Sequence, residues 1–340
     1  MKKLVNLLII ALVGLGVWFL FTGQSDHAME FSNESDIADS EVASENRWSE
    51  YPISLPALMD ENFNGNGLIL GEVLDDNSAY TRYYITYQSG HLTISGIMNV
   101  PKGEGPWPLL VLNHGYIDPE IYTNGRGLKR EQDYLARRGY VVLHPDYRNY
   151  ADSSDDPGTD VSFRLGYTED VINAVLAAQN SGLDFIDKER VGMLGHSMGG
   201  GVTQNVLVVK PDLVQAAVLF APVSGDQRRN YERWITRRSE VVTKIEATYG
   251  QYTADMDFWD GISASTFYNR ITAPIVTHHG TADDSVPLEW SEEMQGEMEQ
   301  AGVDATLYIY DGEPHEFVAA WPLVMQRTVE FFDKYLKTTR

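Results

Sequence analysis

Short apolar runs alternate with longer segments of helical periodicity from about residue 80 to the end of the chain. Continuous apolar runs of four to six residues are typical of strands that are buried on both faces of a parallel sheet. The alternation therefore predicts right-handed βαβ units and a doubly wound, mostly parallel α/β sheet. The expected strands are 109–112, 140–143, 190–194, 216–220, 274–277 and 305–310, and the expected helices are 128–138, 162–180, 198–210, 288–301 and 321–336.

Two further segments modify this pattern. Residues 80–88 and 91–100 are β-branched and aromatic runs around a Ser-Gly turn, which predicts an antiparallel hairpin that opens the sheet. Residues 222–272 occupy a position where the sheet needs only one crossover helix, so we expect a small, mostly helical cap there. The aromatic residues of this insertion could line an acyl pocket, with one arginine facing a substrate carboxylate. Alternatively, its arginines form a solvated face that packs against acidic residues.

The N-terminal part of the chain differs in composition from the rest. Two lysines precede eighteen uncharged, mostly apolar residues, which predicts that residues 1–23 form a membrane anchor or a signal peptide. Residues 24–50 hold eight acidic residues and one arginine, as expected of a disordered tether. The positive-inside rule then places the folded domain, residues 51–340, outside the cytoplasm, either anchored or secreted.

The composition of the 340 residues excludes several classes of protein. Hydrophobic residues make up 43% and charged residues 22%, which rules out a fully disordered, collagen-like or polytopic membrane protein. The formal net charge of -23 repels phosphate backbones, so we expect no nucleic-acid partner. The absence of cysteine excludes disulfides, thiolate catalysis and cysteine-ligated metal centres.

A candidate nucleophile follows the predicted strand 190–194. The sequence Gly195-His196-Ser197-Met198-Gly199 fits G-x-S-x-G between a strand and a helix. This motif holds a serine at a strained turn, where side chains at the two glycine positions would collide with neighbouring backbone. The turn presents the serine oxygen at a helix N-terminus, where N–H groups stabilise developing negative charge. The motif therefore predicts that Ser197 is a catalytic nucleophile.

The base and the orienting acid are expected after later strands. His315 lies in a Gly/Pro-containing loop after the last predicted strand, and among the eight histidines it is the one placed to reach Ser197. An acid that orients this histidine should follow strand 274–277, where Asp283 and Asp284 compete. We favour Asp283, and we expect the other aspartate to cap the helix that begins near residue 288. The resulting order of Ser, Asp and His is the one expected for this type of sheet.

An oxyanion intermediate needs two backbone N–H donors. Met198, directly after the nucleophile, is expected to supply one, and Tyr116, after the first parallel strand and Gly115, the other. The adjacent His278 and His279 lack the spacing and the carboxylate cluster of a metal site. We therefore expect neither a metal ion nor a cofactor.

With these residues the sequence resembles the α/β-hydrolase superfamily. Within it, the chain is most similar to the catalytic domains of the prolyl oligopeptidase and acylaminoacyl-peptidase group, and to related esterases and dienelactone hydrolases, over about residues 80 to 338. The resemblance implies that Asp283 is the acid of the triad. Four segments carry it: Asn113-His114-Gly115-Tyr116, Pro145-Asp146-Tyr147-Arg148, Gly195 to Gly200, and His279 to Pro287 together with His315.

Two departures from the peptidases of this group guide the choice of substrate. About 30 residues, 51–79, separate the tether from the hairpin, which is too few for one blade of the β-propeller that usually precedes the hydrolase domain. Met198 also stands where those peptidases favour an aromatic residue. We therefore expect a serine hydrolase that cleaves small or medium-sized carboxylic esters, with a peptidase acting on short peptides as the alternative. A catalytically silent binding protein is a third hypothesis, and the oligomeric state stays open.

Overall fold

The computed structural model describes residues 47–48 and 51–337. The chain divides into two compact units, residues 1–44 and 45–340, and the described residues all belong to the second. The predicted anchor, 1–23, and nearly all of the predicted tether, 24–50, lie outside the described residues. Within the described part of the chain, no helix is long and apolar enough to cross a membrane.

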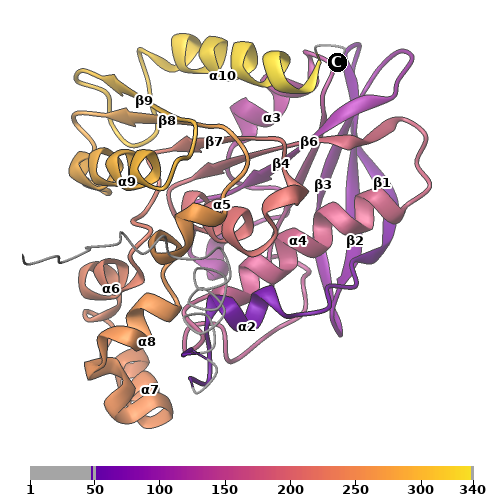
Figure 1. Cartoon of the computed structure of the whole chain (residues 1–340). Coiled ribbons are helices and arrows are strands. Elements are labelled where there is room, and N and C mark those ends of the chain that lie inside the picture. Colours follow the sequence, from indigo (N-terminus) through magenta and orange to yellow (C-terminus); the bar gives the residue numbers. More distant parts are fainter. Residues whose placement is uncertain (1–46, 49–50, 338–340) are drawn as a thin grey trace, which may run out of the picture. The chain divides into compact units, whose positions relative to one another are not determined.

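A nine-stranded sheet forms the centre of the described unit (Figure 1). Its strands are ordered β1-β2-β3-β5-β4-β6-β7-β8-β9. The first three strands and β5 pair antiparallel, and every pair from β5 to β9 is parallel. The bounds are β1 Asn66–Asp76, β2 Tyr80–Ser89, β3 Leu92–Pro101, β4 Trp107–Asn113, β5 Val141–Pro145, β6 Ile186–His196, β7 Ala216–Phe220, β8 Ile275–Gly280 and β9 Ala305–Tyr310.

The parallel strands form where the apolar runs predicted them. All residues of β5, β7 and β8 are buried, because helices cover both faces of the sheet at its centre. The doubly wound, mostly parallel fold predicted from the sequence is thereby confirmed. The carboxyl ends of these strands meet at one edge of the sheet, where ligand sites of such folds lie.

Strand β1 was not predicted from the sequence. Nine of its eleven residues are exposed, so it lacks the apolar run that marks a buried strand. It pairs antiparallel with β2, with irregular register, and extends the predicted hairpin to three strands. We predicted that the hairpin of β2 and β3 forms the start of the sheet. This was wrong, because β1 precedes the hairpin at the edge of the sheet. Ile69, Val73 and Leu74 are exposed apolar side chains on this edge strand.

Helices cover both faces of the sheet (Figure 1). Helices α4, α5 and α9 contribute to one hydrophobic cluster, and α3 and α10 contribute to a second cluster on the opposite face. The bounds are α2 Leu55–Met59, η1 Pro119–Ile121, α3 Lys129–Ala136, α4 Leu165–Asn180, α5 Met198–Val209, η2 Pro211–Leu213, α9 Leu288–Gln300 and α10 Trp321–Leu336.

Helix α4 begins three residues later than its periodicity predicted. Phe163 and Arg164 have φ angles of 51° and 62°, so the chain makes a left-handed turn before the helix starts at Leu165. Such a conformation costs free energy for a residue with a side chain, and surrounding contacts must hold it. The turn places Arg164 against the cavity described below.

The cap consists of short helices between β7 and β8. Its aromatic side chains mostly pack against one another: the ring centroids of Tyr231 and Phe258 lie 5.1 and 5.4 Å from that of Trp259. The expectation that the cap aromatics line an acyl pocket was therefore largely wrong, because a small cap needs an apolar core of its own. The elements are α6 Gln227–Asn230, η3 Tyr231–Ile235, α7 Ser239–Tyr249, η4 Gly250–Ala254, α8 Met256–Gly261 and η5 Ala264–Arg270.

Candidate active site

Ser197 lies in a sharp turn between β6 and α5. Its φ of 55° and ψ of -119° lie outside the regions that ordinary residues occupy, which indicates a strained nucleophile turn. A Cβ atom on Gly195 would lie 2.3 Å from the carbonyl oxygen of Gly199, and one on Gly199 would lie 2.0 Å from that of Asn113. No side chain fits at these distances, so the turn requires both glycines.

Asp283 and His315 are in direct contact, although 32 residues separate them. Asp283 Oδ2 accepts a hydrogen bond from His315 Nδ1 at 2.7 Å, and only 1% of the Asp283 side chain is exposed. Burial favours the neutral carboxyl group, but hydrogen bonds from His279, His315 and the Val286 N–H outweigh it and hold the pKa of Asp283 well below its usual value. The carboxylate is therefore ionised at neutral pH and fixes the ring of His315.

The competing aspartate has a different environment. Asp284 is exposed, and its Oδ1 accepts a hydrogen bond from Ser285 Oγ at 3.1 Å. The expectation that it caps the following helix was wrong, because α9 begins at Leu288 and its N-cap residue is Pro287. Asp283 Oδ1 instead accepts from the N–H groups of Ser285 and Val286, both at 2.9 Å, and closes the loop before the helix.

A second histidine contacts the same carboxylate. His279 Nε2 lies 3.2 Å from Asp283 Oδ2 and 3.1 Å from the carbonyl oxygen of Val286, and its Nδ1 lies 2.7 Å from Ser291 Oγ. Both partners of Nε2 are acceptors, so this nitrogen carries the proton. His279 and Asp283 both belong to the segment His279 to Pro287 that carries the family resemblance, but residue spacing did not predict a contact between them.

The two predicted oxyanion residues lie at the same end of the sheet. Met198 is the first residue of α5, where the helix supplies no partner for a backbone N–H. Tyr116 follows β4, and its half-exposed ring lies beneath the guanidinium of Arg164, with 4.9 Å between Cζ and the ring centroid. Both residues line the same cavity as Ser197 and His315.

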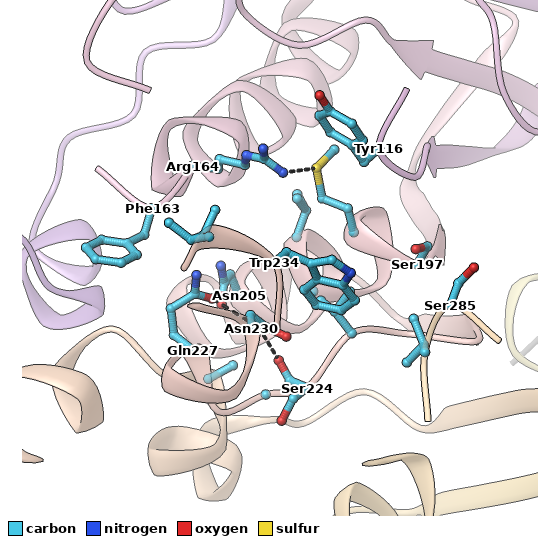
Figure 2. Close-up of a pocket in the computed structure, with 18 of the residues that line it drawn as sticks. Tyr116, Phe163, Arg164, Ser197, Asn205, Ser224, Gln227, Asn230, Trp234 and Ser285 are labelled. Atoms are coloured by element: carbon cyan, nitrogen blue, oxygen red, sulfur yellow. Dashed lines mark hydrogen bonds between the residues drawn. The ribbon is translucent and has the colours of Figure 1, made fainter. Parts of the chain in front are cut away.

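This cavity has a volume of about 570 Å³ and lies between the sheet edge and the cap. Its size is within the range of small-molecule sites. Figure 2 draws the ring of Trp234 between Ser197 and three polar side chains, Asn205 of α5 and Gln227 and Asn230 of α6. Trp234 is thus the cap aromatic that reaches the cavity. Its ring packs edge-on against that of Trp290, with 5.5 Å between the ring centroids.

Two arginines and one aspartate set the charge of one cavity wall. Asp160 accepts hydrogen bonds from Arg238 Nη2 at 2.6 Å and from Arg164 Nη2 at 3.4 Å. Burial opposes ionisation of Asp160, but the two arginines together lower its pKa, so the carboxylate is charged. The wall therefore carries a net charge of about +1. Arg164 was not a predicted site residue, because it came at the start of a presumed amphipathic helix.

Arg228, Arg229 and Arg233 of the cap do not line the cavity. Arg228 pairs with Glu232, and Arg229 pairs with Glu293. Arg233 donates to the carbonyl oxygens of Ser285 and Asp284. These contacts match the second interpretation offered for the insertion, in which its arginines pack against acidic and polar groups.

Comparisons with known proteins show the family and the fold of the chain. The prolyl oligopeptidase family model matches residues 127–339. A probable dipeptidyl peptidase 4 of Neosartorya fischeri is 24% identical over 247 residues, which are 68% of this chain and 30% of that protein. The dipeptidyl peptidase 4 of Felis catus is 31% identical over 189 residues, 54% of this chain and 23% of that protein. The chain thus spans about a third or less of the length of these relatives.

Two solved structures show the same fold. The acylaminoacyl peptidase of Pyrococcus horikoshii has a TM-score of 0.62 and 19% identity, over 78% of this chain and 43% of that one. A Paenibacillus acetyl xylan esterase has a TM-score of 0.63 and 19% identity, over 92% of this chain and 98% of that one. Both a peptidase and an esterase therefore share the architecture. The family match covers more than half of the sequence, and the chain belongs to the prolyl oligopeptidase family of serine hydrolases.

Proposed function

We propose that this protein hydrolyses carboxylic esters of small or medium size through a triad of Ser197, His315 and Asp283. The observation that carries the proposal is the 2.7 Å contact between His315 Nδ1 and Asp283 Oδ2, at a cavity that Ser197 and His315 both line. Nδ1 donates to the carboxylate, which leaves Nε2 of the neutral ring as the base for the serine proton.

The reaction follows from these roles. His315 Nε2 takes the proton of Ser197 Oγ as the oxygen attacks the ester carbonyl, and the N–H groups of Tyr116 and Met198 stabilise the oxyanion. The intermediate collapses to an acyl-enzyme, and His315 returns the proton to the departing alcohol. A water molecule then attacks the acyl-enzyme with the same histidine as base, and the carboxylic acid leaves.

The two arginines and the two carboxylates that line the cavity balance in charge, and only the wall of Arg164, Asp160 and Arg238 disfavours a peptide with a free N-terminus. Among the described residues that line the cavity, the carboxylates are Asp160 and Glu316. Asp160 is engaged by two arginines, so the wall they form repels an ammonium group. The alternative, a peptidase acting on short peptides, is supported by the dipeptidyl peptidase relatives.

The first test compares a short-acyl aryl ester with the matched aminoacyl anilide, using the purified protein and Ser197→Ala as the blank. We expect the ester to be cleaved and the anilide to be cleaved more than about 100-fold less efficiently in kcat/KM. Ser197→Ala should lower kcat by about 10⁴-fold or more and abolish labelling by a fluorophosphonate. Anilide cleavage within about 100-fold of the ester would favour the peptidase. Unchanged turnover in Ser197→Ala, or no turnover of either substrate, would refute the triad.

We further propose that the enzyme acts outside the cytoplasm, held by or released from the segment 1–23. The proposal rests on the two lysines and the uncharged apolar run that follows them. Protease treatment of intact cells that express the full chain should remove the hydrolase activity from the cell surface, or the activity should appear in the medium. Activity that stays protected until the cells are lysed would contradict it.

A further inference from the structure

Arg164 lies against the side chains of both residues that are predicted to supply the oxyanion donors. Its Nη1 donates to Met198 Sδ at 3.2 Å, and its Cζ lies 4.9 Å from the ring centroid of Tyr116. Figure 2 shows the side chain of Arg164 pointing toward the sulfur atom. The guanidinium group is thus separated from the Met198 N–H by no more than one methionine side chain. A substrate group that lies a few bonds from the reacting carbonyl carbon can therefore reach it.

The guanidinium group of Arg164 has few and weak acceptors. It carries five N–H donors, and among the described residues two of them have hydrogen-bond partners. One partner is the thioether sulfur of Met198, which is a weak acceptor. The other is Asp160 Oδ1 at 3.4 Å, which is longer than an ordinary N–H···O hydrogen bond. Arg164 therefore keeps the capacity to bind a further, charged acceptor.

Asp160 forms its stronger hydrogen bonds with Arg238. The Nη1 and Nη2 atoms of Arg238 donate to the two carboxylate oxygens at 3.1 and 2.6 Å, which is the fork geometry of a guanidinium–carboxylate pair. One carboxylate thus serves two guanidinium groups, and the surplus positive charge lies at Arg164. In the part of the chain that the structure describes, Glu316, the other carboxylate of the cavity lining, forms no ion pair with either arginine.

The side chain of Arg164 can be reached by a ligand. It is 23% exposed. A second cavity, with a volume of about 410 Å³, adjoins the first, and the residues that line both are Tyr116, Asp160, Arg164 and Arg238. Arg164 therefore stands at the boundary between two cavities and not behind a further layer of side chains.

We propose that Arg164 is a specificity-determining residue that binds a carboxylate of the substrate, and that the preferred substrates are esters with a carboxylate a few bonds from the scissile bond. This inference rests on the proposed ester hydrolysis and adds to it the class of substrate. The planar fork of a guanidinium group matches a carboxylate, and a carboxylate bound there balances the surplus charge of the wall. The carboxylate belongs either to the acyl group or to the alcohol, and the test has one arm for each.

The test compares esters in pairs in which a methyl ketone replaces the carboxylate. The acyl arm compares monomethyl succinate with methyl 4-oxopentanoate, and the alcohol arm compares acetoxyacetate with acetoxyacetone. Both members of a pair carry a carbonyl oxygen at the same place and differ in charge. Hydrolysis is followed by proton release, and for each enzyme we take the ratio of kcat/KM, anionic over neutral. Dividing the ratio of a variant by that of the wild type cancels the intrinsic reactivity of the esters and the fraction of folded protein.

We expect Arg164→Gln to lower this ratio by about tenfold or more in at least one arm, because a charged hydrogen-bond donor is replaced by a neutral one. Arg228→Gln is the matched control. It removes the same charge from the protein, but Arg228 pairs with Glu232 and does not line the cavity, so this variant should keep the wild-type ratio in both arms.

Ratios that are the same in the wild type and in Arg164→Gln in both arms would overturn the inference while leaving ester hydrolysis intact. An equal fall of the ratio in Arg228→Gln would also overturn it, because the effect would then come from the net charge of the protein and not from a contact. Hydrolysis of the aryl ester above but of neither anionic ester would have the same meaning. If none of these esters is hydrolysed, the proposed function itself fails and takes this inference with it.

Discussion

Asp283 Oδ2 accepts from two imidazole rings, and the second ring has a network of its own. His279 Nδ1 contacts Ser291 Oγ in α9, and its Nε2 contacts Asp283 Oδ2 and the carbonyl oxygen of Val286. A carboxylate oxygen with two fixed donors cannot rotate away from either without losing a hydrogen bond. We infer that His279 is a positioning residue that keeps Asp283 aligned with His315.

The His279→Phe variant should lower kcat by about tenfold, equivalent to about 1.4 kcal/mol in the barrier, with KM nearly unchanged. The reason is that Asp283 then has one donor fewer and orients His315 less well. Steady-state kinetics on the aryl ester give the two constants. His278→Phe is the matched control, since His278 is equally buried on the same strand but contacts Tyr310 on the other face of the sheet. Equal loss of kcat in both variants would contradict the positioning role.

The sequence led to Ser197, Asp283 and His315 because each lies in a recognisable motif after a predicted strand. It could not identify His279 or Arg164 in the same way. The place of His279 depends on contacts with Ser291 and Asp283. Such properties arise from packing between segments distant in the chain, which residue spacing does not encode.

At the scale of elements, one arginine connects the cap with the loop that carries Asp283. Arg233 in η3 donates from Nε and Nη2 to the carbonyl oxygen of Ser285 at 3.0 and 2.8 Å. Its guanidinium also lies 5.6 and 5.7 Å from the ring centroids of Trp234 and Trp290. The cap therefore supports the loop that carries Asp283, and the two elements are not mechanically independent.

Arg233→Ala should lower kcat/KM for the ester by about tenfold, because the loop that holds Asp283 and the ring of Trp234 both lose a contact. Thermal inactivation of the hydrolase activity should also begin below the temperature of global unfolding seen by circular dichroism. Arg229→Ala on the same cap removes exposed ion pairs, which contribute little, and should behave as the wild type. If Arg229→Ala lost as much activity as Arg233→Ala, the loss would come from removing any positive charge from the cap and not from the contacts of Arg233.

The elements themselves were largely predictable, with two instructive exceptions. Apolar runs revealed the parallel strands because burial on both faces leaves little room for polar residues. Strand β1 was not predicted because its side chains are mostly exposed. The start of α4 was misplaced because a left-handed turn at Phe163 and Arg164 interrupts an otherwise helical pattern. Both depend on pairing or strain rather than on periodicity.

At the scale of the whole molecule, several buried histidines make folding sensitive to acid. Burial is the main cause that lowers the pKa of His196 to about 4, and the neighbouring His315 lowers it further. Burial is also the main cause that lowers the pKa of His278 to about 3, and Arg327 lowers it further. An unfolded histidine has a pKa of about 6.5. Between that value and about pH 4 the unfolded state therefore binds more protons than the native state, and stability falls as the pH falls.

We expect the free energy of unfolding to decrease from pH 6.5 towards pH 4.5, by up to about 1.4 kcal/mol per pH unit for each such histidine. His278→Phe should reduce this slope by about one proton, because one buried base is gone. Urea unfolding at pH 6.5, 5.5 and 4.5 measures the slopes. His91→Asn, at an exposed turn between β2 and β3, should retain the wild-type slope. Identical slopes in His278→Phe and the wild type would contradict this account.

The exposed strand β1 has a practical consequence for handling the protein. Within the described part of the chain β1 pairs with β2 alone, so its outer edge offers backbone groups to another copy. Ile69 and Val73 would assist such a contact, whereas Glu72 and Asp75 on the same strand repel a second, equally acidic copy. Acidified stocks lose this repulsion, so concentrated samples should be stored near neutral pH, and fibrous precipitates after acid exposure should be traced first to this edge.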